Sequence, residues 1–127
     1  MALGVGEMRV LVCGGRDFND WDLLHEVLNG LNNDKAIDCI IEGDARGADR
    51  LAGQWAQQHG IGLRIFVPEY DQFGPRLAPP LRNQRMLDEG KPDLVVAFPG
   101  GGGTRDMISR AIKAGVPIHE VNRADDW

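Results

Sequence analysis

The sequence has little of the chemistry by which metal sites are usually recognised. Its 127 residues include two cysteines and three histidines. No Cys-x-x-Cys pair occurs, and His25, His59 and His119 are scattered, so the spacing that metal ligands need is missing. Cys13 and Cys39 both lie inside apolar runs, which predicts two reduced thiols in the core. We therefore expect neither a metal nor another cofactor.

Long apolar runs and an excess of positive charge are also missing. No N-terminal stretch resembles a signal peptide and no run is long enough to span a membrane, which predicts a cytoplasmic protein without a membrane partner. The net charge is -5 and the pI is about 5.1. This acidic balance argues against the broad basic surface that non-specific DNA binding needs, so nucleic acid is not the expected partner. Any anionic ligand must be held locally.

The sequence does contain a regular alternation of strand and helix patterns. Its length and its 43% hydrophobic content fit one domain, residues 1–127, with no linker dividing it. Short apolar runs predict strands, and apolar residues at helical spacing predict helices, as on the stripe that carries Trp55. The expected strands span residues 8–13, 37–43, 62–67, 93–98 and 116–121. The expected helices are one capped by Asn19 or Asp20, one from Ala48 that Gly60 closes, one over about 81–89 after a proline-rich loop, and one over 104–114.

This order predicts an α/β fold, a single Rossmann-like domain. Near-continuous apolar strands between amphipathic helices indicate an open, doubly wound parallel sheet of about five strands, with helices on both faces. The expected strand order is 3-2-1-4-5. In such sheets ligands bind outside the carboxyl ends of the strands, where the winding reverses. Here that crevice lies between the first and fourth strands.

Three glycine-rich, charged loops leave the strands at this edge: "GGRDFND", "GDARGAD" and "PGGGGTRD". A glycine loop that opens a helix presents unpaired N–H groups and the positive end of the helix dipole, which together favour phosphate. For any one loop, tight turns and a capping role for Thr104 explain the residues equally well; three loops at one edge favour a ligand site. The candidate ligand-binding residues are Gly14, Gly15, Arg16, Asp17, Gly43, Arg46, Arg82, Gly100, Gly101, Gly102, Gly103 and Thr104.

Neither of the common phosphate-binding motifs is present. The chain has no G-x-x-x-x-G-K-[ST], which excludes a P-loop NTPase. The dinucleotide-binding motif G-x-G-x-x-G is also absent. Gly101 and Gly103 match its first two glycines, but Asp106 stands at the position of the third, and this loop follows the fourth strand rather than the first. A common NAD site is therefore not expected.

Several motifs resemble those of the SLOG superfamily, a Rossmann-like group that includes the Lonely Guy phosphoribohydrolases and DprA-type proteins. "VCGGRDF", "GDARGADRLAGQWA" and "FPGGGGTRDM" together resemble its YspA and cpYpsA-related branch, from Met8 to Val121. The resemblance implies a domain that binds a nucleotide or nucleotide-derived ligand, of a kind common in bacteria and phages. It also suggests homodimerisation. A DNA-processing role, which the DprA likeness suggests, is opposed by the acidic balance.

Where hydrolytic relatives carry glutamate, this chain has methionine. The loop resembles the Lonely Guy pattern P-G-G-x-G-T-x-x-E, which is associated with hydrolysis of the N-glycosidic bond in nucleoside 5′-monophosphates. Arg82 matches an arginine of that pattern, but Met107 stands at the glutamate position. A carboxylate can stabilise the developing oxocarbenium charge or activate water, and a thioether can do neither. Since Met107 also continues an apolar helical stripe, we interpret it as a core residue.

Two hypotheses remain. The first is a binding module that senses or sequesters its ligand, with the glycine loop on phosphate and Arg82 assisting. The second is a nucleoside 5′-monophosphate N-glycoside hydrolase with Arg82 and Asp106 as candidate catalytic residues. In the second, Asp17 or Glu42 could replace Asp106 as the carboxylate.

Each charged candidate also has a structural interpretation. Arg82 could belong to a solvated basic helix face with Arg85. Asp106 and Asp49 could complement helix N-termini, and Asp17 could close an Asx-turn.

Overall fold

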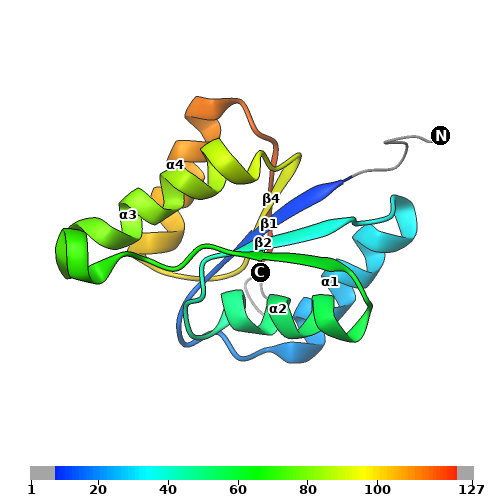
Figure 1. Cartoon of the computed structure of the whole chain (residues 1–127). Helices are drawn as coiled ribbons and strands as arrows, with labels where there is room; N and C mark the ends of the chain where they lie inside the picture. The colour runs from blue at the N-terminus through cyan, green and yellow to red at the C-terminus, as the bar shows by residue number, and fades with distance from the viewer. Residues whose placement is uncertain (1–7, 123–127) are drawn as a thin grey trace.

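The computed structural model describes residues 8–122 and forms a five-stranded parallel sheet with four helices (Figure 1). The strand order is β3-β2-β1-β4-β5, which confirms the predicted topology. Residues 1–7 and 123–127, the ends of the expected domain, lie outside the described residues. In chain order the elements are β1 (Arg9–Cys13), α1 (Trp21–Asp34), β2 (Cys39–Glu42), α2 (Ala48–Gln58), β3 (Gly62–Ile65), α3 (Tyr70–Gly90), β4 (Leu94–Ala97), α4 (Gly102–Ala114) and β5 (Ile118–Glu120).

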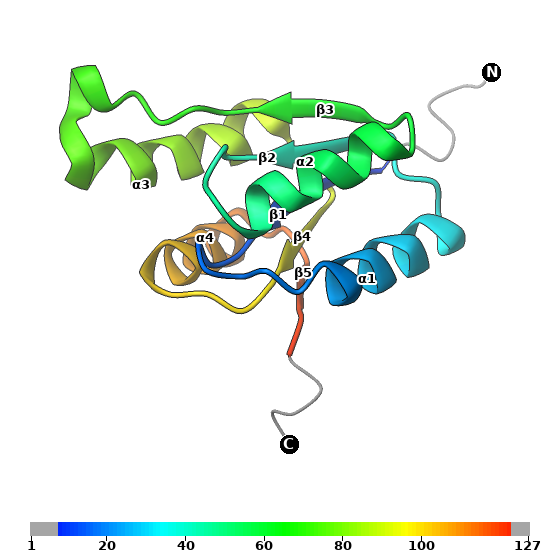
Figure 2. The same ribbon diagram turned by 90° about the horizontal axis from the view of Figure 1, so that it is seen from below.

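The sheet lies between two helical layers. Helices α1 and α2 cover one face, and α3 and α4 cover the other (Figures 1 and 2). Side chains alternate along β1, so that Val10 and Val12 pack with α1 and α2 while Leu11 and Cys13 pack with α3 and α4. Both faces are therefore buried, which explains the uninterrupted apolar strands of the sequence.

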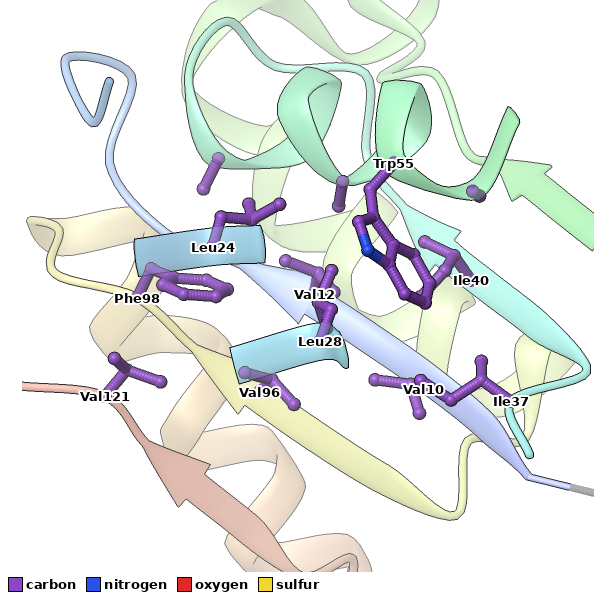
Figure 3. Packing of buried hydrophobic residues seen from close by; sticks show 13 residues of the cluster. Val10, Val12, Leu24, Leu28, Ile37, Ile40, Trp55, Val96, Phe98 and Val121 are labelled. Carbon is purple, nitrogen blue, oxygen red and sulfur yellow. The ribbon is translucent and has the colours of Figure 1, made fainter. Parts of the chain in front are cut away.

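The larger of the two cores lies under α1 and α2. Trp55 fills its centre among Leu28, Val12 and Ile40, and is fully buried, as predicted (Figure 3). Its indole Nε1 donates to Asn29 Oδ1 at 2.9 Å, so the one polar atom of the ring is satisfied. In the part of the chain that the structure describes, no helix has the length and apolar character needed to cross a membrane.

The proline-rich segment was predicted wrongly. It is not a loop, because α3 runs from Tyr70 to Gly90 with one break at Gly74, whose φ of 78° and ψ of 173° are not helical. Pro75 opens the longer part of the helix, at a position where its missing N–H costs nothing. Pro79 and Pro80 follow within the helix, where each removes one backbone hydrogen bond. Helix α4 also begins earlier than predicted, at Gly102 rather than Thr104.

Gly47 joins the loops that leave β1 and β2. Its φ is +89°, and a Cβ there would fall against the carbonyl oxygen of Gly15 and 2.7 Å from that of Arg16. The same Gly15 carbonyl accepts a hydrogen bond from Ala48 N at 3.3 Å. Both the backbone conformation and the close approach therefore require glycine at this position.

Substitution of Gly47 tests how strongly this junction is constrained. We expect Gly47→Ala to lower the free energy of unfolding by roughly 3 kcal/mol, because backbone strain of about 1–3 kcal/mol adds to the clash with the β1 loop. Gly60→Ala is the matched control, since its φ is also positive, at +65°, but nothing lies within 4 Å of an added Cβ. Its expected cost is about 1 kcal/mol. Equal losses in urea unfolding would show that the loop contact contributes nothing.

Candidate functional site

A cavity of about 470 Å³ opens at the carboxyl ends of the strands, at the predicted crevice between β1 and β4. It is built from the loops after β1, β2 and β4 together with the middle of α3. The residues that line it are Cys13, Gly14, Gly15, Arg16, Ala45, Asp49, Pro79, Pro80, Arg82, Asn83, Met86, Gly101, Gly102, Gly103, Thr104 and Asp106. Residues of all three glycine-rich loops therefore meet at one site.

The loops after β1 and β4 are held together by backbone hydrogen bonds. Gly15 N donates to Pro99 O at 2.9 Å, and Phe98 N donates to Cys13 O at 2.9 Å. A Cβ at Gly100 would lie 2.6 Å from Gly15 N and against the Thr104 hydroxyl. Gly100 therefore allows the two loops to approach each other, and it is not among the residues that line the cavity.

The N-terminus of α4 points open backbone donors at the cavity. Gly101 caps the helix without a side-chain hydrogen bond, and the first bond of the helix runs from Arg105 N to Gly101 O at 3.0 Å. Among residues 8–122, no acceptor contacts the backbone N–H groups from Gly101 to Thr104. Gly101, Gly102 and Gly103 are exposed and line the cavity, and a Cβ added at any of them would meet nothing within 4 Å, so there is room for a ligand beside these donors. Such a group of N–H donors, at the positive end of a helix dipole, is suited to an anion.

Arg82 brings a buried positive charge to the same cavity. The residue is only 9% exposed. Nη1 donates to the carbonyl of Gly43, and Nε donates to Asn83 Oδ1 at 3.1 Å. A Cβ at Gly43 would lie 2.5 Å from Nη1, so glycine is needed there to admit the guanidinium. Burial lowers the pKa of Arg82, with Asp49 acting in the opposite direction, yet a guanidinium stays charged near neutral pH.

The charge on Arg82 lacks a close carboxylate. Within the described chain, no carboxylate oxygen lies within 4.0 Å of its nitrogen atoms, and Nη2 donates to no protein acceptor. A buried charge of this kind is costly unless a partner of opposite sign compensates it. An anion in the cavity would supply that partner.

Asp49 closes the loop between β2 and α2. Its Oδ2 accepts from Gly43 N at 3.1 Å and from Ala45 N at 3.2 Å, and the side chain is buried. Burial raises the pKa of Asp49 to about 6, against the opposing effect of Arg82. The sequence indicated only a helix-dipole role for Asp49. Asp49 reaches the cavity wall because the "GDARGAD" loop turns back on itself, so that Gly43 N and Ala45 N donate to the Asp49 carboxylate.

Asn83 was not identified from the sequence at all. Its amide donates to Asp106 Oδ2 at 2.9 Å and to Gly103 O at 3.3 Å, while its carbonyl oxygen accepts from Arg82. It therefore links α3 to the start of α4. The signal that could have found it is its position directly after Arg82 in "RNQRM".

Asp106 lies on the wall, but one of its oxygens is already engaged. Asp106 Oδ2 accepts from Arg110 Nε at 2.8 Å as well as from Asn83. Met107, one residue further on, is fully buried in the core under α3 and α4, as its apolar stripe predicted. The helix therefore presents no carboxylate at the position of the hydrolytic glutamate.

Comparison with known proteins identifies the family. The sequence profile YAcAr, described as the YspA, cpYpsA-related SLOG family, matches residues 8–73, about half of the chain. The Gene 61 protein of Mycobacterium phage D29 is 35% identical over 124 residues, which cover 87% of this chain and 93% of that protein. The chain belongs to the YspA, cpYpsA-related SLOG family. The region that carries Arg82 and the α4 glycine loop lies beyond the profile match.

A solved structure shares the fold of this SLOG chain. The X-ray structure of DNA processing protein A (DprA) from Streptococcus pneumoniae superimposes with a TM-score of 0.74 at 20% identity. The alignment covers 94% of this chain and 52% of that one, so the chain spans about half the length of the DprA protein. At this identity the likeness establishes the fold alone.

Some candidate residues of the SLOG chain lie outside the cavity. Asp17 and Arg46 form a surface ion pair of 3.1 Å, and their side chains are 97% and 69% exposed. Gly43 lies behind Arg82 and supplies the carbonyl that holds it. Glu42 is buried beside Gly53, away from the cavity, and accepts from Asp44 N. Arg85 points away, with Nη1 3.4 Å from Glu69 Oε1.

Glu42 gives the fold a dependence on pH that can be measured. Burial raises its pKa to about 7, and the nearby Asp49 and Asp44 act in the same direction, against the Asp44 N–H. Because the folded pKa is higher than the unfolded one, the stability that Glu42 contributes below about pH 4.5 is lost as the pH rises through 7. We expect Glu42→Gln to raise the free energy of unfolding at pH 8.5 by about 1–3 kcal/mol, and to have little effect at pH 4.

Urea unfolding at the two pH values measures this difference. Glu26→Gln, on the exposed side of α1, removes one negative charge without touching the buried site and serves as the control. A Glu42→Gln protein that kept the full pH dependence of the parent would contradict the assignment.

Proposed function

We propose that this SLOG chain binds a nucleotide or a nucleotide-derived ligand, with a phosphate group at the N-terminus of α4. The observation that carries the proposal is the meeting of open backbone donors, from Gly101 to Thr104, with the buried guanidinium of Arg82 on one cavity. Membership of the SLOG superfamily, which generally binds nucleotides, supports the same ligand class.

The cavity suits the separate parts of a nucleotide. Phosphate oxygens would accept from the N–H groups of α4 and from Nη2 of Arg82, as charge-assisted hydrogen bonds. The rings of Pro79 and Pro80, with Met86, form an apolar wall for the sugar or the base. A carboxylate beside the phosphate would be repelled, so Asp106 is better placed for ribose hydroxyls than for the phosphate itself.

The geometry favours binding over hydrolysis. Met107 is buried, and Asp106 is tied to Asn83 and Arg110. One observation supports the alternative, a nucleoside 5′-monophosphate N-glycoside hydrolase. Asp49, whose pKa is raised to about 6, also lines the cavity, and a carboxyl with such a pKa could exchange protons near neutral pH.

A side chain at Gly102 should block the phosphate. Because nothing lies within 4 Å of a Cβ there, Gly102→Val fills space that the ligand would use without disturbing the protein. We expect it to weaken nucleotide binding at least about tenfold in calorimetry, while the melting temperature changes by only a few degrees. Gly30→Val, on α1 and equally free of neighbours, is the matched control. If Gly102→Val bound as tightly as the parent, the phosphate assignment of the loop would be wrong.

Incubation with a panel of nucleoside 5′-monophosphates separates the two functions. We expect calorimetry to detect binding and chromatography to find no free base after long incubation, because no carboxylate occupies the position of the hydrolytic glutamate. Release of base that is lost in Asp49→Asn or Arg82→Ala would instead establish the hydrolase. A catalytically inactive but binding-competent Asp49→Asn protein would then identify the catalytic carboxyl.

A further inference from the structure

A second cavity, of about 280 Å³, adjoins the first. The two share Arg16, Ala45, Pro79 and Arg82 in their walls, so they meet around the Arg82 guanidinium. The second cavity lies where β2 and β3 end, between the loop after β2 and the first turn of α3. In Figure 2 the arrowheads of β2 and β3 point toward this part of α3. We call this second cavity the arginine annex.

The annex is strongly positive on a protein that is acidic overall. Among residues 8–122, its wall carries four arginines, namely Arg16, Arg46, Arg50 and Arg82, but only one acidic residue, Asp44. The whole chain has a net charge of -5. Like charges gathered in one place repel one another, so such a concentration is costly unless an anion neutralises it.

The carboxylates near these arginines would compete only weakly with an incoming anion for the guanidinium groups. Arg46 pairs with Asp17, whose side chain is 97% exposed, and Arg50 lies 3.5 Å from Asp44. Exposed ion pairs of this kind contribute only about 0–1 kcal/mol to stability, because water screens the charges and forming the pair costs side-chain conformational entropy. A phosphate could therefore displace either carboxylate at little cost.

Arg16 and Arg82 lie close together at the junction of the two cavities. The positive charge of Arg16 is among the influences that lower the pKa of Arg82, after burial, which has the largest effect. Arg16 is exposed, and within residues 8–122 no carboxylate oxygen lies within 4.0 Å of its guanidinium. The guanidinium of Arg16 and Nη2 of Arg82 are thus available to an anionic ligand that spans the two cavities.

We propose that the ligand carries a second phosphate group, which the arginine annex binds while the first phosphate occupies the N-terminus of α4. The inference rests on the proposed function, because it extends the same site. Tyr70, which also lines the annex, offers an aromatic ring beside this second group. Two ligand classes share this chemistry: nucleoside 5′-diphosphates and nucleoside 3′,5′-bisphosphates.

Calorimetry with matched nucleotides tests the second phosphate. The 5′-monophosphate, 5′-diphosphate and 3′,5′-bisphosphate of each common nucleoside are titrated into the full chain at constant ionic strength. We expect at least one doubly phosphorylated nucleotide to bind about tenfold or more tightly than its monophosphate, and which class does so identifies the arrangement of the phosphates.

Substitutions of single arginines test whether the second phosphate binds in the annex. Arg50→Gln should reduce the preference for the second phosphate to about threefold or less and leave affinity for the monophosphate unchanged, because Arg50 lines the annex and does not line the first cavity. Arg9 is an exposed arginine at the amino end of β1, away from the carboxyl ends of the strands where the annex lies. Arg9→Gln removes the same charge and should leave the preference intact.

The outcomes distinguish this inference from the proposed function. If the protein bound monophosphates without any preference for a second phosphate, the inference that the annex binds a phosphate would be wrong, and the proposed function would be unaffected. The same holds for a preference that survives Arg50→Gln and Arg46→Gln unchanged. If no nucleotide bound at all, both proposals would be wrong.

Discussion

The rest of the site depends on the hydrogen bonds that the buried guanidinium of Arg82 donates. It crosses from α3 to the loop after β2, where the Gly43 carbonyl accepts from it, and it holds Asn83 through a second hydrogen bond. Asn83 in turn donates to Gly103 and Asp106 on α4. One charge therefore ties together three segments that are distant in the sequence, although no carboxylate oxygen of residues 8–122 lies within 4.0 Å of it.

The glycines around this charge serve different purposes, although they look alike in the sequence. Gly43 leaves room for the guanidinium, and Gly100 lets the β4 loop reach Gly15. Gly47 adopts a backbone conformation that side chains rarely allow. The glycines at the start of α4 differ from all of these, because no atom of residues 8–122 outside their immediate neighbourhood lies within 4 Å of a Cβ added at Gly101, Gly102 or Gly103. Their lack of a side chain leaves room for a ligand beside the backbone donors, which is the physical reason to propose binding at this loop.

The sheet order, the main core residues and the place where the glycine-rich loops meet could be predicted, because they follow from local patterns in the sequence. Alternating apolar strands and helical stripes indicated the sheet order and the burial of Trp55 and Met107, and the carboxyl ends of the strands indicated where the loops meet. The helix through Pro79 and Pro80 was missed, since prolines normally interrupt helices. Asp49 and Asn83 were missed as residues of the cavity wall, because the position of Asp49 depends on how its loop folds back and that of Asn83 on hydrogen bonds between α3 and α4.

The central claim is that a phosphate occupies the N-terminus of α4, and amide NMR tests it most directly. Uniformly 15N-labelled protein would be titrated with nucleoside 5′-monophosphates and with inorganic phosphate, which lacks the sugar and base. We predict that the largest amide shifts occur from Gly101 to Thr104, with the Arg82 Nε–H signal moving over the same concentration range. Shifts confined to other surfaces, with the amides from Gly101 to Thr104 unmoved at saturation, would contradict the account.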